Sequence, residues 1–322
     1  MPAIISPSQN RRNLGVALDP DWIGSTVINR SATEQRAATM VGRRTVKKQW
    51  QAAWLVRAIE CIDLTTLAGD DTTSNVHRLC SKARQPLSGD MLTQLALDSV
   101  HVGAVCVYHE HVRTCVELLQ GSGIPVAAVS TGFPAGKTPH DLKIKEIQAS
   151  VADGAAEIDI VISRAHVLRG DWELLYREMH EYRQASGNAH LKAILATGEL
   201  GTLTNVAKAS LVCMMAGADF IKTSTGKEPV NATLPVSLVM VRAIRGYGDR
   251  TGYQVGFKPA GGIRTAKQSL DYLMLMKEEL GDEWLTPALF RMGASALLSD
   301  IERQLEHFLT GTYSAYNRHP MG

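Results

Sequence analysis

The chain has 322 residues, of which 45% are hydrophobic and 20% are charged, and its formal net charge is +2. A chain of this length can bury a full core as one large domain or as two smaller ones, and its composition is that of an ordinary soluble globular protein. Because neither sign of charge is in large excess, the composition gives no reason to expect nucleic acid or an anionic membrane as a partner.

The cysteines and the N-terminus bear on the cellular compartment. The five cysteines are odd in number, scattered, and without a C-x-x-C spacing, so we expect no disulfide framework and no zinc site, and a reducing cytoplasm fits. No apolar run reaches the roughly 20 residues that span a bilayer, and the N-terminus lacks the apolar segment of a secretory signal. Arg11, Arg12 and Arg30 leave a transit peptide as the alternative, without the amphipathic pattern that would support it.

The first part of the chain differs in pattern from the rest. Residues 1–42 are rich in Ser, Pro, Asn and Gly and show no sustained periodicity, so we expect a loosely ordered N-terminal extension. Residues 43–322 are expected to form one domain, which begins with a helix over residues 43–59 and ends in a C-terminal tail. The helix is predicted to pack on the body through a stripe at helical spacing, formed by Val46, Trp50, Ala53 or Trp54, and Arg57.

After this helix, short apolar runs alternate with helical sequence to the end of the chain. Strands are predicted at residues 61–65, 104–108, 126–130, 157–162, 191–196, 219–223, 254–258 and 290–293. Helices are predicted over residues 74–83, 90–99 and 111–120, with a further one that ends near residue 152. Continuous apolar strands are typical of a parallel sheet that is covered on both faces.

Eight strands at about 30 residues per unit predict an α/β protein with a (β/α)8 TIM barrel, preceded by an extra N-terminal helical segment. A doubly wound open sheet is the competing architecture. Its usual G-x-G-x-x-G sequence after the first strand is absent, so the barrel is preferred.

Among the charged residues of the predicted strands, we single out Asp63, Asp159, Lys222 and Lys258. Charged residues near the carboxyl ends of barrel strands project toward the active-site mouth. One such residue could be a satisfied polar group in the core, but four on four different strands are better explained as one site.

The two lysines lie on consecutive predicted strands, which are neighbours in a barrel. A second ammonium group nearby disfavours protonation of the first, which makes an amine nucleophilic near neutral pH. On this argument either Lys222 or Lys258 could be the nucleophile, with Asp159 exchanging protons through a water molecule or offsetting the positive charge. The structural alternative is that Lys258 and Asp159 simply pair, while Lys222 reaches solvent from the end of its strand.

Glycine-rich turns follow the seventh and eighth predicted strands, at residues 261–264 and 293–295. Glycines let backbone N–H groups approach an anion at a helix N-terminus, and these two loops form the usual phosphate site of a TIM barrel. Gly226 and Lys227 could close this site from the sixth strand. The alternative is two tight turns that bind nothing.

Several motifs together resemble deoxyribose-phosphate aldolase. They are DLTTL (63–67), GFPAG (132–136), EIDIVI (157–162), FIKTSTGK (220–227) and GFKPAGGIR (256–264). The segments KKQWQAAWL and ELGTLTNV and the long C-terminal section are similar to the longer, animal-type branch of that family. The resemblance runs from about Arg43 to the end of the chain.

The resemblance implies a Schiff-base (class I) aldolase that needs no metal and no cofactor. Such an enzyme interconverts 2-deoxy-D-ribose 5-phosphate with glyceraldehyde 3-phosphate and acetaldehyde in deoxyribose phosphate catabolism. By motif position, Lys222 would form the imine and Lys258 would lower the pKa of Lys222. Asp159 would relay protons with a bound water, and Asp63 would orient Lys258 or a substrate hydroxyl.

The resemblance also implies residues that surround the substrate. Thr65, Cys106 and Thr225 would line its pocket, although a cysteine in an apolar strand is equally explained as core. The phosphate would be held by Gly226, Lys227, Gly261, Gly262, Arg264, Gly293 and Ser295.

This chain departs from the family in two places. Ala296 follows Ser295 where many relatives have a second hydroxyl residue, which is expected to raise the Michaelis constant more than to stop the chemistry. Tyr313 and Tyr316 are both candidates for a C-terminal tyrosine that acts near the site, and the sequence assigns the role to neither.

Two other functions stay open on the sequence. One is a different imine-forming sugar-phosphate aldolase or transaldolase, and the other is a non-catalytic scaffold that binds a sugar phosphate. The intact set of Lys222, Lys258 and Asp159 argues against the scaffold. In each case the expected partner is a small sugar phosphate, and a homo-oligomer remains open.

Overall fold

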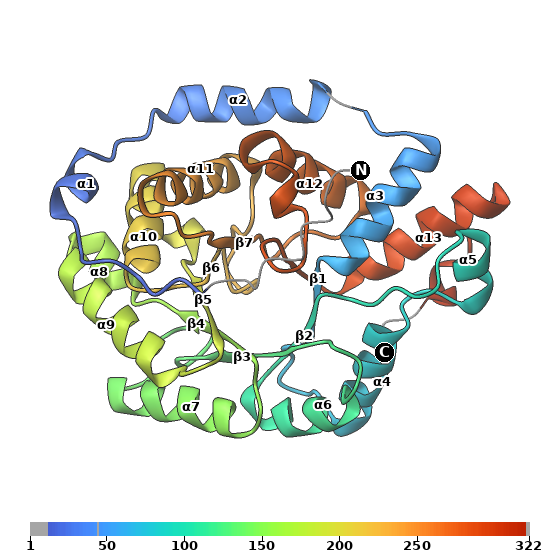
Figure 1. Cartoon of the computed structure of the whole chain (residues 1–322), viewed down its shortest axis with the longest axis horizontal. Helices are drawn as coiled ribbons and strands as arrows, with labels where there is room; N and C mark the ends of the chain where they lie inside the picture. Colours follow the sequence, from blue (N-terminus) through green and yellow to red (C-terminus); the bar gives the residue numbers. More distant parts are fainter. Residues whose placement is uncertain (1–11, 44, 320–322) are drawn as a thin grey trace, which may run out of the picture.

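The computed structural model describes residues 12–43 and 45–319. These residues form one parallel eight-stranded sheet in the order β7-β6-β5-β4-β3-β2-β1-β8. Backbone bridges from Phe257 to Phe290 and from Ala260 to Gly293 bring β7 beside the chain around β8. The sheet therefore curves into a TIM barrel, and the prediction of this fold is confirmed (Figure 1).

Every predicted strand is present, with bounds that differ from the prediction by a few residues. The strands are β1 Ile62–Thr65, β2 Ala104–Val107, β3 Val126–Ser130, β4 Glu157–Val161, β5 His190–Ile194, β6 Phe220–Lys222, β7 Gly256–Lys258 and β8 Met292–Ala294. Lys222 and Lys258 are the last residues of their strands, so each stands at the carboxyl end of the barrel.

Helices surround the barrel in Figure 1. They are α3 Lys48–Glu60, α4 Thr73–Arg84, α5 Gly89–Gln94, α6 Val112–Leu118, α7 His140–Ala152, α8 Arg164–Arg169, α9 Trp172–Ala185, α10 Leu203–Met215, α11 Leu234–Thr251, α12 Ala266–Leu280 and α13 Ala296–Thr310. Helix α5 is shorter than predicted, since its last residue is Gln94 and Leu95 caps it. None of the described helices is long and apolar enough to cross a membrane.

The segment before the barrel contains two helices where the sequence predicted a loosely ordered extension. They are α1 Pro20–Ser25 and α2 Arg30–Arg43. Helix α2 buries only Thr33, Ala37 and Met40, and a stripe this narrow gives little hydrophobic periodicity in the sequence. In Figure 1, α2 lies outside α11 and α12, and Arg36 Nη2 donates to Glu278 Oε2 of α12 at 3.0 Å. Residues 1–11 of the predicted extension lie outside the described residues.

Helix α3 confirms the predicted helix near residues 43–59. Of the predicted packing face, Trp54 packs against the core but Trp50 does not. The buried face is formed by Ala52, Leu55, Ala58 and Ile59, whereas Trp50 is 68% exposed. Small and aliphatic side chains allow α3 to lie close to α12 and α13. A large apolar side chain does not by itself mark the buried face of a helix, because Trp50 lies on the exposed side of α3.

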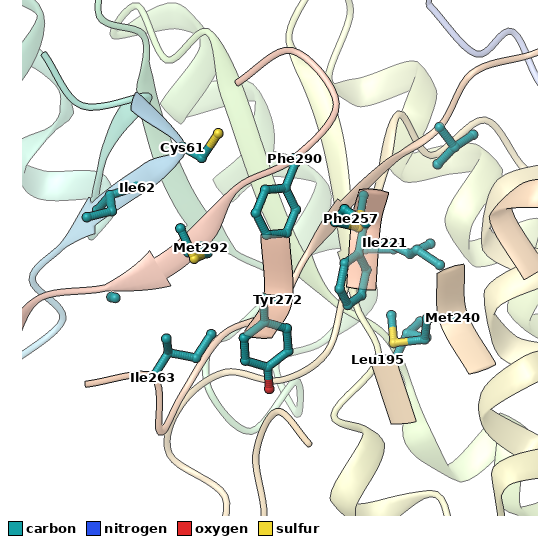
Figure 2. Packing of buried hydrophobic residues seen from close by; sticks show 14 of the residues in the cluster. Cys61, Ile62, Leu195, Ile221, Met240, Phe257, Ile263, Tyr272, Phe290 and Met292 are labelled. Carbon is teal, nitrogen blue, oxygen red and sulfur yellow. The ribbon is translucent and has the colours of Figure 1, made fainter. Parts of the chain in front are cut away.

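The hydrophobic core lies mainly between the outer face of the barrel and the helices. Figure 2 shows Ile221, Phe257, Phe290 and Met292 on the strand side facing Tyr272 and Met240 from the helices. The rings of Phe257 and Phe290 stack with their centroids 6.5 Å apart. Because neighbours along a strand point to opposite faces, the residues next to these in sequence point into the barrel.

Candidate active site

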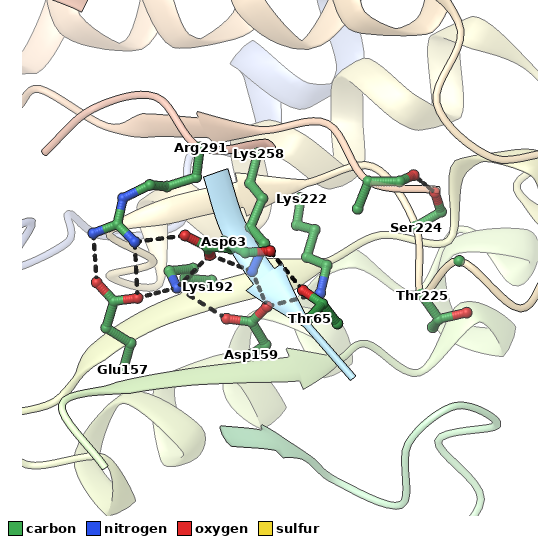
Figure 3. Close-up of polar contacts among 12 residues, drawn as sticks. Asp63, Thr65, Glu157, Asp159, Lys192, Lys222, Ser224, Thr225, Lys258 and Arg291 are labelled. Carbon is green, nitrogen blue, oxygen red and sulfur yellow. Dashed lines mark hydrogen bonds and ion pairs between the residues drawn. The ribbon is translucent and has the colours of Figure 1, made fainter. Parts of the chain in front are cut away.

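The four charged residues that the sequence singled out come together inside the barrel (Figure 3). Lys222 and Lys258 are register partners on β6 and β7. Asp159 Oδ2 accepts a hydrogen bond of 2.7 Å from the Nζ atom of each lysine. Asp63 Oδ2 lies 2.5 Å from Lys258 Nζ. One carboxylate oxygen thus joins the two amines, and of these two amines the Asp63 carboxylate contacts Lys258 but not Lys222.

Three further charged residues, which the prediction missed, extend this cluster toward the amino end of the strands. Lys192 Nζ lies 3.2 Å from Asp159 Oδ1 and 3.3 Å from Asp63 Oδ2, and it also bonds Glu157. Arg291 donates to Asp63 Oδ1 at 2.6 Å and to Glu157 Oε1 at 2.9 Å. All three residues fall within predicted strands, so the signal that identified the first four was present for them as well.

The buried network contains three carboxylates and four cations, all of which are at most 5% exposed. Burial alone would raise the pKa of Asp159, but the charges of Lys192, Lys222 and Lys258 outweigh it and hold this pKa well below its ordinary value. Burial opposes ionisation of Asp63 in the same way, and Lys192, Lys258 and Arg291 lower its pKa. Both carboxylates are therefore ionised at neutral pH.

The two lysines of the site differ in their electrostatic surroundings. Burial lowers the pKa of Lys222, and the charge of Lys258 lowers it further against the opposing effect of Asp159. For Lys258 the attraction of Asp159 and Asp63 outweighs burial, so its pKa is raised. Lys222 is consequently the amine that loses its proton more readily, and a neutral amine is the nucleophilic form.

A cavity of about 230 Å³ opens above this network, and Lys222 lines it whereas Lys258 does not. Thr65 of β1 and Thr225 of the loop after β6, which the sequence analysis named as pocket residues, also line the cavity. The predicted phosphate residues line the same cavity, namely Gly226, Lys227, Gly261, Gly262, Arg264, Gly293 and Ser295. Lys222 and the loops that the sequence predicted to bind phosphate therefore share one cavity.

The glycines after β7 are required by conformation, and Gly261 is also required by space. Gly261 and Gly262 have φ angles of 81° and 84°, in the left-handed region that side chains disfavour. A Cβ atom on Gly261 would also lie 2.6 Å from the Asn231 side chain. After β8, Ser295 and Ala296 line the cavity at the start of α13, where the helix dipole favours an anion. Ala296 adds no hydroxyl there.

The predicted pocket residue Cys106 and the candidate tyrosines of the C-terminal tail have other surroundings. Cys106 is fully buried in a small apolar cluster with Leu67, Ala127 and Val129, and it is not among the residues that line the cavity. Tyr313 is 56% exposed, and its ring stacks on His307 of α13 with centroids 4.1 Å apart. The side chain of Tyr316 lies outside the described residues.

Within residues 12–43 and 45–319, no group of three or more His, Cys, Asp or Glu side chains is arranged to hold a metal ion. The carboxylates of the site are instead bonded to the ammonium and guanidinium groups described above.

Comparisons with known proteins agree with this geometry. The model of the DeoC/LacD family aldolase matches residues 57–302. The chain is 60% identical to deoxyribose-phosphate aldolase of Mus musculus, over 95% of this chain and 98% of that protein. It is 58% identical to deoxyribose-phosphate aldolase of Homo sapiens, over 96% and 98%.

Among solved structures, a putative deoxyribose-phosphate aldolase from Toxoplasma gondii ME49 superposes with a TM-score of 0.69. It is 22% identical and covers 83% of this chain and 98% of its own, so it supports the fold alone. A structure named QR15, an Aldolase, has a TM-score of 0.61 at 26% identity and covers 78% and 97%. With the family model and the mammalian relatives in agreement, the chain belongs to the deoxyribose-phosphate aldolases of the DeoC/LacD family.

Proposed function

We propose that this protein is a class I aldolase that reversibly cleaves 2-deoxy-D-ribose 5-phosphate to D-glyceraldehyde 3-phosphate and acetaldehyde. The relatives carry the name of this activity. The observation that carries the proposal for this chain is that Lys222, the amine with a lowered pKa, lines the same cavity as the glycine loops, Lys227 and Arg264. An amine at one end and an anion site at the other match a phosphorylated aldehyde.

In the proposed mechanism, the neutral Nζ atom of Lys222 attacks the C1 aldehyde of the open-chain sugar, and water leaves as a protonated imine forms. The C3 hydroxyl then loses its proton, and the C2–C3 bond breaks to give the aldehyde of glyceraldehyde 3-phosphate. The electron pair of that bond moves through C2 and C1 to the imine nitrogen, which leaves an enamine. Protonation at C2 and hydrolysis of the imine release acetaldehyde and restore the lysine.

Asp159 is proposed to transfer protons in these steps, and Lys258 is proposed to favour the neutral form of Lys222. Asp159 Oδ2 bonds the Nζ atoms of both lysines at 2.7 Å, so it can accept a proton from one group and return it to another through a bound water. Lys258 stays positively charged because its pKa is raised, and its charge favours the neutral form of Lys222. Asp63 positions Lys258 by the contact of 2.5 Å.

The 5-phosphate is proposed to bind at the end of the cavity that Lys227, Arg264 and the two glycine turns form. Two cations and the backbone N–H groups of glycine turns are the groups that recognise a phosphate. The proposed cellular location is the cytoplasm, which the five free, buried cysteines support.

Product analysis tests the proposed reaction. We expect the purified protein to convert 2-deoxyribose 5-phosphate to acetaldehyde and glyceraldehyde 3-phosphate in equal amounts, measured by mass spectrometry after derivatisation of the aldehydes. In the reverse direction, acetaldehyde should serve as the donor and dihydroxyacetone should not. Transfer of a dihydroxyacetone unit without cleavage of 2-deoxyribose 5-phosphate would show a transaldolase or another aldolase instead.

A further inference from the structure

The loop between β6 and α11 contains a buried carboxylate that the proposed mechanism does not use. Glu228 is 9% exposed, although its neighbours Lys227 and Pro229 are exposed. A buried carboxylate is costly unless it is paired or hydrogen-bonded. Its position beside the proposed phosphate site adds a second cost, because the negative charge of Glu228 opposes the binding of a phosphate.

The Glu228 carboxylate is bonded to its own loop. Its two oxygens accept from the Thr225 backbone N–H at 3.1 and 3.0 Å, and Oε2 also accepts from Thr225 Oγ1 at 2.7 Å and from the Gly226 N–H at 3.2 Å. Within the described part of the chain, none of its hydrogen bonds or ion pairs goes to a cation. Hydrogen bonds from backbone N–H groups to an ionised carboxylate are among the stronger ones in proteins.

These bonds fix the segment that faces the cavity. Thr225, Gly226 and Lys227 all line the cavity, and the Lys227 backbone N–H donates to Thr225 Oγ1 at 3.0 Å. Thr225 Oγ1 therefore links Lys227 to Glu228. The Glu228 carbonyl accepts from Asn231 Nδ2 at 2.7 Å, and the Asn231 side chain fills the space beside Gly261. The loop after β6 is thus fixed against the glycine turn after β7.

We propose that Glu228 is the positioning residue that makes the site select a phosphorylated substrate, by fixing the Thr225–Lys227 turn so that the Lys227 ammonium group meets the phosphate. The inference rests on the proposed function and deepens it. The N–H groups of Thr225 and Gly226 already bond Glu228, so the contribution of this loop to phosphate binding is the side chain of Lys227. The other donors come from the loops after β7 and β8 and from Arg264.

Two substitutions separate positioning from charge. In Glu228→Ala the Thr225–Lys227 turn loses all of its carboxylate bonds. In Glu228→Gln the amide oxygen can occupy the place of Oε2, which accepts from Thr225 N, Thr225 Oγ1 and Gly226 N. The glutamine variant therefore keeps the three bonds to Oε2 and removes the negative charge, and it loses only the second bond of the Thr225 N–H, to Oε1. Val230→Ala is the matched control, because Val230 lies in the same loop and is 53% exposed.

The test measures steady-state kinetics with 2-deoxyribose 5-phosphate and with 2-deoxyribose. We expect Glu228→Ala to raise KM for the phosphorylated sugar about tenfold, with kcat changed less than about twofold and kcat/KM for 2-deoxyribose unchanged. Glu228→Gln and Val230→Ala should stay within about threefold of the unchanged protein. A lower KM in both Glu228 variants would show that the Glu228 charge competes with the phosphate, which would contradict the proposal. An equal loss of kcat/KM on both sugars, or no loss on either, would show that Glu228 has no selective role.

A double-mutant cycle tests whether Glu228 acts through Lys227. If it does, Lys227→Ala/Glu228→Ala should bind phosphate no more weakly than Lys227→Ala alone. Additive losses in the double variant would overturn the proposal.

Calorimetric titration with inorganic phosphate follows binding without carbon–carbon chemistry. Affinity should fall about tenfold in Glu228→Ala, and equal affinity in the two proteins would overturn the inference. Because this titration does not depend on the aldol reaction, it tests Glu228 even if the unchanged protein fails to cleave 2-deoxyribose 5-phosphate. In that case the proposed function alone would have failed.

Discussion

Asp159 contacts all three lysines of the buried network, so its removal changes the site at the point where the amines meet. Asparagine has nearly the same shape but carries no charge and accepts no proton at neutral pH. We expect Asp159→Asn to lower kcat by at least about a hundredfold, the size of a general acid–base contribution. Circular dichroism is the control, and kcat within about threefold of the unchanged protein would contradict the proposed proton relay.

The pH dependence of imine formation tests the electrostatic role of Lys258. Burial and the charge of Lys258 lower the pKa of Lys222, and imine formation requires the neutral amine, so the rate should rise with pH through a pKa below 10.5. In Lys258→Met the positive charge is lost, the pKa of Lys222 rises, and the rising limb should move to higher pH. Trapping rates with acetaldehyde and cyanoborohydride measure this limb, and a shift to lower pH would contradict the account.

Asp63, Asp159, Lys222 and Lys258 could be found from the sequence because a charge within a short apolar strand is unusual. Lys192, Glu157 and Arg291 carried the same signal but were missed. Position in a strand does not tell which charges meet, since this depends on the register between strands. The pairing of Asp159 with Lys192 appears only in that register, whereas the approach of Lys222 to Lys258 could be expected from their consecutive strands.

At the scale of elements, a buried side chain joins the segment before α1 to the barrel, beside backbone bonds of Asn13 and Val16. Asn13 is 1% exposed, and its Nδ2 donates to the carbonyls of Met214 at 2.7 Å and Ala218 at 2.9 Å. Its Oδ1 accepts from Tyr247 Oη at 3.0 Å. These bonds join the N-terminal segment to the end of α10 and to α11.

Replacement of Asn13 should therefore weaken the fold without affecting the chemistry. We expect Asn13→Ala to lower the free energy of unfolding by about 2–4 kcal/mol, because several buried partners lose their hydrogen bonds together. Urea denaturation measures this loss, and Gln35→Ala on the exposed face of α2 is the control. A loss below about 0.5 kcal/mol would show that the segment is not fixed by Asn13.

The elements themselves differed in how well the sequence could predict them. The strands were found because eight short apolar runs recur between helical segments. Helix α2 was missed because its contact with the barrel is made by Thr33, Ala37 and Met40 and by arginines that bond Glu278 and Glu279 of α12. A helix held by small residues and long-range ion pairs leaves little local pattern in the sequence.

At the scale of the whole molecule, the charged network inside the barrel couples stability to pH. The pKa values of Asp63, Glu157 and Asp159 are lowered in the folded protein, because the neighbouring cations outweigh burial. A carboxylate with a lowered pKa in the folded state stabilises the fold above its unfolded pKa and loses this contribution as pH falls. The ordinary values of these groups are 3.8 and 4.5.

We therefore expect the free energy of unfolding to stay nearly level, as far as these groups are concerned, between pH 7 and about pH 5. Below that range it should fall steadily, because protonation of the unfolded chain precedes protonation of the fold. Urea denaturation at constant ionic strength measures the curve. Unfolding free energies that are unchanged between pH 5 and pH 3 would contradict the network as a source of stability.

The overall architecture could be predicted because strand length, apolar composition and repeat spacing all pointed to the same barrel. The choice of Lys222 over Lys258 could not be made from spacing, since both lysines end neighbouring strands. In the structure the choice is supported by access to the cavity and by the number of carboxylates at each amine, which are properties of the assembled barrel.

Reductive trapping tests the central claim most directly. After incubation with acetaldehyde and borohydride, peptide mass mapping should find a two-carbon adduct on Lys222, and the adduct should be absent in Lys222→Ala. Lys258→Met should still carry it on Lys222 when trapping is performed at higher pH. An adduct on Lys258, or none on the unchanged protein, would contradict the assignment of Lys222 as the nucleophile.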